Sequence, residues 1–120
     1  MATIQRFEDL ECWKEARKWA NQIYNLLESS RDFWFRDQIQ RAAISVMNNI
    51  AEGFGRTTVP DKIHFFIFAT SSLFEIRSMI YLGTDRRYFT EQDCEELLKQ
   101  NQVIMDLTFG FLKYLHSLKK

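Results

Sequence analysis

The segment from Thr58 to Leu82 limits what this chain can fold into more than any other part of the sequence. On a helical wheel its apolar side chains cover an arc of about 260°, whereas a surface helix of a globular protein needs an apolar stripe of roughly 100°. Its clear polar strip consists of His64, Ser71, Glu75 and Ser78. A helix of this kind is buried on more than one side, although every helix in a bundle of four keeps an outer face. We therefore expect this outer face to contact a second copy of the chain.

The expected contact between copies also involves the preceding segment, whose core stripe is flanked by a second, semi-apolar edge. The candidate interface residues are Ile44, Met47, Phe65, Phe68, Ile76 and Met79. An alternative is that the aromatic side chains only enlarge the core of a single bundle. Large apolar patches are rare on monomers, and this favours the oligomer.

The low content of glycine and proline favours an all-α fold. The 120 residues include 4 glycines and 1 proline, too few to form the hairpin turns of an all-β domain. Apolar residues at three- and four-residue steps predict helices over about 8–28, 36–52 and 58–82, and from about residue 90 to near the C-terminus. We expect glycines to end two of these helices, because glycine adopts the left-handed conformation of a C-cap. The expected stops are Gly53 and Gly55 for the second helix and Gly83 for the third.

Helix starts and short linkers define the predicted topology. Thr58 with Asp61, and Thr90 with Asp93, have the spacing of a capping box at the start of a helix. Short linkers place neighbouring helices antiparallel. The whole chain is therefore predicted to be a single domain, an up-down-up-down antiparallel four-helix bundle, and the apolar third helix predicts that it assembles into a homo-oligomer.

Cysteine use, charge and hydropathy favour a cytoplasmic protein. Cys12 and Cys94 begin helices of opposite direction, which places them about 30 Å apart and prevents a disulfide. Residues Met1–Trp13 lack the apolar core of a signal peptide, and the longest apolar run, Phe65–Ala69, is far shorter than the ~20 residues that span a bilayer. The chain has 16 basic and 16 acidic residues and a net charge of 0, so no global field attracts it to nucleic acid or membrane. No membrane partner is expected.

The sequence lacks the residue constellations of catalytic and metal sites. Its two histidines are His64 and His116, and Asp61-x-x-His64 is the only loose match to the Glu-x-x-His pattern of metal sites in bundles. Zinc-ligand spacing, a P-loop and a nucleophile elbow are missing. A pair of buried carboxylates, Glu52 and Glu75, is a weaker alternative to salt bridges or surface positions. We expect no catalytic residue, no cofactor and no metal ligand, and hence no enzyme.

Basic residues gather at both predicted ends of the bundle. The end formed by the first and third linkers holds Arg31, Arg36, Arg86 and Arg87, and the opposite end holds Arg56, Lys113, Lys119 and Lys120. In a ring each cluster repeats once per subunit, so a modest patch becomes a charged rim. Such a rim would bind nucleic-acid phosphates with a steep dependence on salt. The alternative is that these charges serve solubility.

A polar stripe runs along the second helix, opposite its core stripe. Its residues are Asp37, Arg41, Ser45, Asn48, Asn49 and Glu52. Asp37 and Arg41 have the spacing of an i,i+4 ion pair. Two interpretations remain open: a solvated helix face, or a recognition face on which Arg41 and the asparagines donate to phosphates or base edges.

The same helix carries a motif that resembles the signature of a known family. The motif comprises Gln38-Ile39-Gln40-Arg41-Ala42-Ala43, Ser45 and Asn49-Ile50-Ala51-Glu52-Gly53-Phe54-Gly55-Arg56. It resembles a bacterial family of four-helix-bundle proteins first noticed within intervening sequences of large-subunit ribosomal RNA genes. The opening residues Phe7-Glu8-Asp9-Leu10-Glu11-Cys12-Trp13 and the third-helix residues Phe66, Ala69, Ser72, Leu73 and Glu75 agree with the same family. The motif positions of interest are Arg41, Ser45, Asn49, Glu52, Gly53 and Glu75.

The resemblance implies a homopentameric ring without an established enzymatic activity. The family is also similar to the accessory variability protein of diversity-generating retroelements, a basic pentameric barrel that binds nucleic acid and a reverse transcriptase. RNA or DNA is therefore the implied partner, and an oligomeric scaffold that binds a protein partner is the alternative. This chain departs from the family pattern at Ser71, where glycine is usual, and at Gln40, where a second arginine is common. Serine at position 71 implies looser or hydrogen-bonded packing there.

Overall fold

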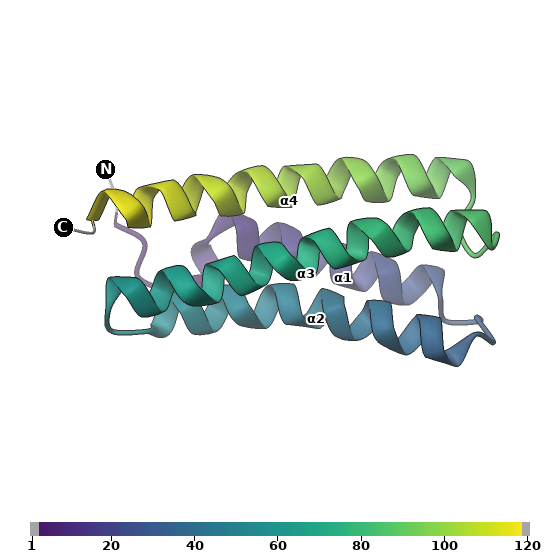
Figure 1. Ribbon diagram of the computed structural model, residues 1–120, viewed down its shortest axis with the longest axis horizontal. Helices are drawn as coiled ribbons and strands as arrows, with labels where there is room; N and C mark the ends of the chain where they lie inside the picture. Colours follow the sequence, from purple (N-terminus) through teal and green to yellow (C-terminus); the bar gives the residue numbers. More distant parts are fainter. Residues whose placement is uncertain (1–2, 119–120) are drawn as a thin grey trace.

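Four long helices make up most of the computed structural model, which describes residues 3–118 (Figure 1). A short 3-10 helix, η1 (Phe7–Asp9), precedes α1 (Glu11–Leu26), α2 (Phe33–Gly55), α3 (Val59–Asp85) and α4 (Glu91–Leu118). Each long helix runs antiparallel to the next, and α1 packs on both α2 and α4. No strand occurs in the described residues. The prediction of an all-α four-helix bundle is confirmed.

Side-chain caps explain where three of the helices begin. The Thr58 hydroxyl accepts a hydrogen bond from the Asp61 amide at 3.3 Å. Thr90 and Asp93 form a complete capping box, in which each side chain accepts from the backbone amide of the other at 3.0 and 3.2 Å. The cap of α2 was missed: Asp32 accepts from the Phe35 amide at 3.0 Å. Because this cap supplies an acceptor for a free amide of the first turn, α2 begins three residues earlier than predicted.

α2 ends at Gly55, one of its two predicted stops. Gly53 and Gly83 do not end their helices, which corrects the prediction. Both lie inside a helix, and no glycine of residues 3–118 has a positive φ. A Cβ on Gly53 would lie 2.8 Å from the Phe66 ring, and a Cβ on Gly83 would lie 2.6 Å from the Phe89 ring. These glycines are needed because aromatic rings pack directly against the helix backbone.

Arg87 supplies the left-handed residue that ends α3. Its φ is 64°, the one positive φ at a non-glycine residue of the described chain. The Tyr88 amide donates to the Gly83 carbonyl at 2.8 Å, and the Arg87 amide donates to the Thr84 carbonyl at 3.0 Å. This pair of bonds is a Schellman motif, in which glycine is the usual left-handed residue.

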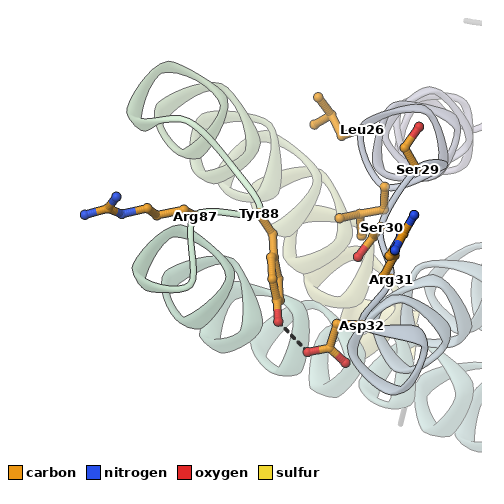
Figure 2. Close-up of a pocket in the computed structure, with 8 residues that line it drawn as sticks. Leu26, Ser29, Ser30, Arg31, Asp32, Arg87 and Tyr88 are labelled. Atoms are coloured by element: carbon orange, nitrogen blue, oxygen red, sulfur yellow. Dashed lines mark hydrogen bonds between the residues drawn. The ribbon is translucent and has the colours of Figure 1, made fainter.

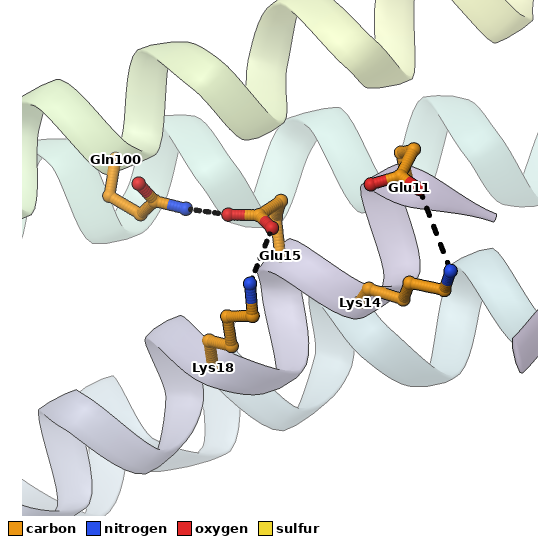
Figure 3. A network of polar contacts seen from close by, with 5 residues as sticks. All are labelled: Glu11, Lys14, Glu15, Lys18 and Gln100. Carbon is orange, nitrogen blue, oxygen red and sulfur yellow. Dashed lines mark hydrogen bonds and ion pairs between the residues drawn. The ribbon is translucent and has the colours of Figure 1, made fainter. Parts of the chain in front are cut away.

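Polar contacts join α1 to α4 beside the apolar core (Figure 3). Glu15 accepts from Gln100 at 2.7 Å and from Lys18 at 3.0 Å. These two bonds lower the pKa of Glu15. Inside the core, the buried Asn101 amide donates to the Leu73 carbonyl at 2.9 Å.

Cys12 and Cys94 are both free thiols. Cys12 lies beside Thr108, which follows Cys94 by 14 residues in α4. Cys12 and Cys94 are therefore separated by about 21 Å along the bundle. The predicted separation of about 30 Å was too long because α1 has only 16 residues. The observed separation still excludes a disulfide. Burial raises the pKa of the Cys12 thiol to about 11.

The outer side of α3 is apolar, as expected. Large hydrophobic side chains are exposed at Ile67, Phe68, Phe74, Tyr81 and Leu82, which we call the outer α3 face. Ile76 is 0% exposed and belongs to the core, so its prediction as an interface residue is wrong. Ile44 is exposed, whereas Met47, Phe65 and Met79 are half-buried.

By length and composition alone, α3 would also pass as a membrane-spanning helix, with 39% of the relevant window buried in the bundle. A core helix of a bundle passes the same test, and α3 places Phe66, Leu73 and Ile80 in the core.

Candidate nucleic-acid interface

The α1–α2 and α3–α4 connections meet at one end of the bundle (Figure 1). A hydrogen bond joins them: the Tyr88 hydroxyl donates to Asp32 Oδ2 at 2.5 Å (Figure 2). The other oxygen of Asp32 accepts from the Phe35 amide. The Tyr88 bond, the Phe35 amide and the charge of Arg86 together lower the pKa of Asp32. One ionised carboxylate therefore caps α2 and holds the opposite loop.

Aromatic rings pack on the core side of the Tyr88–Asp32 junction. The Phe35 ring lies 5.1 Å from the Tyr88 ring, edge to face, and 6.2 Å from the Phe89 ring. Phe35 and Phe89 are buried, and both rings also pack against Gly83. The α3–α4 loop is thereby held against the first turn of α2, which makes this end a defined surface.

A pocket of about 460 Å³ with a mixed polar and apolar lining opens beside the junction. It is lined by Leu26, Leu27, Ser29, Ser30, Arg31, Asp32, Arg87 and Tyr88. Arg31 lies on the α1–α2 side of the pocket (Figure 2). The Arg87 side chain extends away from the Tyr88–Asp32 bond on the other side. Arg31 and Arg87 thus line the pocket from different loops, and the Arg87 guanidinium points outward.

Four predicted basic residues come together at this end, which we call the arginine end: Arg31, Arg36, Arg86 and Arg87. Arg36 pairs with Asp37 at 3.1 Å. The predicted pair of Asp37 with Arg41 is wrong, because the Arg36 guanidinium occupies Asp37 and Arg41 forms no ion pair in the part of the chain described. Within residues 3–118, the other three arginines of this end have no carboxylate within 4.0 Å.

Acidic residues outnumber the arginines at this end of the bundle: Glu28, Asp32, Asp37, Asp85, Glu91 and Asp93. Asp37 is held by Arg36, and Asp32 is occupied by Tyr88 and the Phe35 amide. The local formal charge is therefore slightly negative, although three guanidinium groups have no carboxylate partner among the described residues.

The opposite end is less clearly basic than predicted. Arg56 stacks over the Phe65 ring at 4.4 Å. Lys113 is exposed near the end of α4, and the predicted site residues Lys119 and Lys120 lie outside the described residues. A mainly apolar pocket of about 470 Å³ lies here, with walls that include Phe54, Phe111 and Tyr114.

Two aromatic residues at the arginine end were missed by sequence reasoning. Phe33 and Trp34 occupy the first turn of α2 and are exposed. Asp32 could have revealed them. An aspartate is a typical N-cap residue, and a cap at Asp32 predicts that Phe33 and Trp34 lie in the first turn of the helix rather than in a linker. Arg36 stacks over the Phe33 ring at 4.8 Å.

The inner part of the polar stripe on α2 joins α2 to α3. The hydroxyls of Ser45 and Ser72 are 3.0 Å apart, and the Asn49 amide donates to the Ser45 hydroxyl and carbonyl at 2.9 Å. The Gln38 amide donates to Glu75 at 2.8 Å. Ser45 and Gln38 thus bond to the neighbouring helix α3, whereas Asn49 holds Ser45 from within α2; all three have a structural role.

The outer motif residues remain at the surface. Arg41, Asn48 and Glu52 are exposed, and Arg41 lines a small hollow of about 250 Å³ with Tyr24 and Ile44. Ser71 is exposed and is no part of the helix contact, so the expectation of altered packing there is wrong; the adjacent Ser72 makes the hydrogen bond.

Among the described residues, no three His, Cys, Asp or Glu side chains cluster in a way that would hold a metal ion. Glu52 and Glu75 are exposed, so they are not paired buried carboxylates.

Comparison with known proteins adds a family and a fold. The family model described as 23S rRNA-intervening sequence protein matches residues 8–110. A solved structure of a protein of unknown function from the S23 ribosomal protein family of Bacteroides thetaiotaomicron is similar, with a TM-score of 0.79 and 22% sequence identity. The similarity covers 85% of this chain and 98% of that chain, and at this identity it shows a shared fold. No curated protein matches the chain.

Proposed function

The chain belongs to the 23S rRNA-intervening sequence protein family, and from this premise we propose that it is a non-catalytic, ring-forming RNA-binding protein of the cytoplasm. Resemblance to the family suggests five copies in the ring. The observation that carries the RNA-binding proposal is the arginine end, where three arginines have no carboxylate partner among the described residues and two of them, Arg31 and Arg87, line a pocket from different loops. A ring repeats this end once per subunit.

The outer α3 face supports assembly. Its five large hydrophobic side chains follow one side of a helix that is apolar on average, and Phe74 alone is 56% exposed. Contiguous apolar surface of this kind on a soluble protein marks an interaction site. Ile44 on α2 is also exposed, but it lies beside Tyr24 of α1 and is not part of the outer α3 face.

Phosphate recognition is the favoured use of the arginine end. Guanidinium groups form paired hydrogen bonds with phosphate oxygens, and a ring of such groups contacts several phosphates at once. Arg31 and Arg87 come from different loops, and the Tyr88–Asp32 bond fixes the loops relative to each other. The site therefore suits a structured RNA better than a single free phosphate.

A protein-binding scaffold is the second candidate, and the charge balance of the arginine end favours it. Six acidic residues accompany the four arginines, whereas nucleic-acid sites are usually strongly basic.

Native mass spectrometry tests both parts of the proposal. The protein is measured alone and with a ribosomal RNA hairpin at increasing ammonium acetate concentration. A mass of five subunits and an added RNA mass that disappears with rising salt are expected. Charge reversal of Arg86 and Arg87 to glutamate should abolish the RNA mass and leave the subunit number unchanged. A monomer would overturn the ring, and rings that ignore the hairpin would favour the scaffold.

A further inference from the structure

The first turn of α2 presents two large aromatic side chains to solvent at the arginine end. Trp34 is 73% exposed, the highest value among the large hydrophobic side chains of residues 3–118, and Phe33 is 58% exposed. The next residue, Phe35, points inward and is buried. Because the Asp32 cap and buried Phe35 set the rotation of this turn, Phe33 and Trp34 are held outward on a rigid helix rather than on a loop.

The aromatic residues lie among planar cations. Arg36 stacks over the Phe33 ring at 4.8 Å, and Arg31 precedes the turn in the chain. Tyr88 links the Asp32 carboxylate to the α3–α4 loop, and the positive charge of Arg86 in that loop helps to lower the pKa of Asp32. Exposed rings beside arginines are typical of sites that bind single-stranded nucleic acids, where bases stack on rings and phosphates contact the cations.

Charge alone is insufficient for tight binding at this end. Acidic residues outnumber its arginines by six to four, so the end as a whole provides no long-range attraction to a polyanion. Stacking of a base on an aromatic side chain does not depend on net charge, and it contributes roughly 5- to 100-fold in affinity per base. The exposed rings supply the contribution that the charges lack.

We infer that Phe33 and Trp34 form a stacking platform for unpaired bases, so that the RNA recognised here carries single-stranded nucleotides in a loop, bulge or end. This inference rests on the proposed RNA-binding function and specifies its ligand. Continuous duplex is a poor ligand for the platform, because its bases are already stacked and side chains read it mainly through its shape and sugar–phosphate surface. A second copy of this chain is the less favoured occupant, since the outer α3 face offers a larger apolar surface without arginines among its residues.

Intrinsic fluorescence gives a direct readout of the platform. Trp19 is 1% exposed and Trp13 is half-buried, so iodide in solution quenches mainly Trp34. We would titrate the assembled protein with single-stranded oligoadenylate of about 12 nucleotides, a length within the range of single-strand binding sites, and with an RNA duplex of similar length. Oligoadenylate should quench the tryptophan emission and protect it from iodide, and the duplex should do neither.

Matched variants separate stacking from charge. Trp34→Ala should weaken oligoadenylate binding by roughly 5- to 100-fold, and Trp34→Phe should restore most of the affinity. Phe109→Ala on α4 removes another exposed aromatic side chain and should leave the affinity unchanged. Far-UV circular dichroism and the elution volume of each variant verify folding and subunit number.

The failures of the inference and of the proposed function can be distinguished. If oligoadenylate and the ribosomal hairpin bind Trp34→Ala as tightly as the original protein, the stacking platform is wrong and RNA binding stands. The platform is also overturned if Trp34→Ala changes the subunit number at unchanged RNA affinity, because Trp34 is then a contact between copies. If the original protein binds neither RNA at low salt, the proposed function itself is wrong.

Discussion

The Tyr88 hydroxyl donates a hydrogen bond to the carboxylate of Asp32, 56 residues earlier in the chain. Asp32 also caps α2, so one side chain joins the start of α2 to the loop between α3 and α4. Arg31 is the chain neighbour of Asp32, and Arg87 is the chain neighbour of Tyr88. The position of the two arginines relative to each other therefore depends on this bond. An ionised carboxylate therefore helps to hold the arginine end together, and its negative charge lies among the arginines.

Removing the Tyr88 hydroxyl should destabilise the protein in a pH-dependent way. Tyr88→Phe is expected to lower the Tm by a few °C at pH 7. The pKa of Asp32 is lowered below 3.8 in the folded state, so this stabilisation is complete above about pH 5 and is lost as the pH falls below about 4. Thermal unfolding of both proteins at pH 7 and pH 3 tests this. Tyr114→Phe at an exposed position is the control, and an equal Tm difference at both pH values would contradict the linkage.

Two glycine-to-alanine substitutions should have opposite effects on stability. In Gly83→Ala the new methyl group would meet the Phe89 and Phe35 rings at 2.6 and 2.9 Å. Overpacking of this kind costs about 1–3 kcal/mol, more than the gain in helix propensity. Gly110→Ala has no heavy atom within 4 Å of the new Cβ and should stabilise α4 by up to ~1 kcal/mol. Urea unfolding measures both, and a stable Gly83→Ala protein would refute the close packing.

Replacing Arg87 with glycine should raise stability and weaken RNA binding at the same time. Arg87 has a φ of 64°, a conformation that costs a residue with a side chain about 1 kcal/mol relative to glycine. Arg86 has a φ of −81°, so Arg86→Gly should lose stability while removing the same charge. Urea unfolding and hairpin titration of the two variants separate backbone strain from phosphate contact. A less stable Arg87→Gly protein would be inconsistent with strain at this position.

The outer α3 face should control assembly without controlling folding. Phe74→Glu introduces a charge at a side chain that is 56% exposed and should dissociate the oligomer into folded monomers. Ile76→Ala, two residues away, empties a buried position and should cost about 2–5 kcal/mol of stability. Light scattering after size-exclusion chromatography and circular dichroism measure the two effects. The interface assignment fails if Phe74→Glu keeps the original subunit number.

The two thiols should react at very different rates. The pKa of Cys12 is raised to about 11 by burial, so roughly one molecule in a thousand carries the thiolate at pH 8. Cys94 is half-buried at the start of α4. Titration with a disulfide reagent at pH 8 should detect one thiol quickly and the second only after unfolding. Rapid loss of both thiols in the native protein would show that the α1–α4 contact opens.

Helical periodicity predicted the bundle well because four amphipathic or apolar segments with short linkers have few ways to bury their stripes. The errors arose where a residue has two physical roles. Gly53 and Gly83 look like helix stops, yet they allow Phe66 and Phe89 to approach the backbone. A wheel placed Ile76 at the edge of a broad apolar arc, and only the packed neighbours decide that it is buried.

The candidate site was predictable in part. Topology alone brought Arg31, Arg36, Arg86 and Arg87 to one end. Trp34 was missed because the start of α2 depends on the Asp32 cap, and the sequence equally allows a linker there. The ion pair of Asp37 could not be predicted either. Two arginines, Arg36 and Arg41, are close enough in the sequence to pair with it, and the structure shows the pair with Arg36.

The buried Asn101 has a consequence for how the helices choose their alignment during folding. Its amide reaches the Leu73 carbonyl, and its own side-chain oxygen has no partner among the described residues. A slip of α4 by one heptad would place Cys94 or Thr108 opposite Leu73 and leave the Asn101 amide buried without an acceptor, at a cost of about 1–3 kcal/mol. The apolar residues around it would tolerate such a slip far better. A single polar side chain thus favours one register of α4 against α3 over the neighbouring registers.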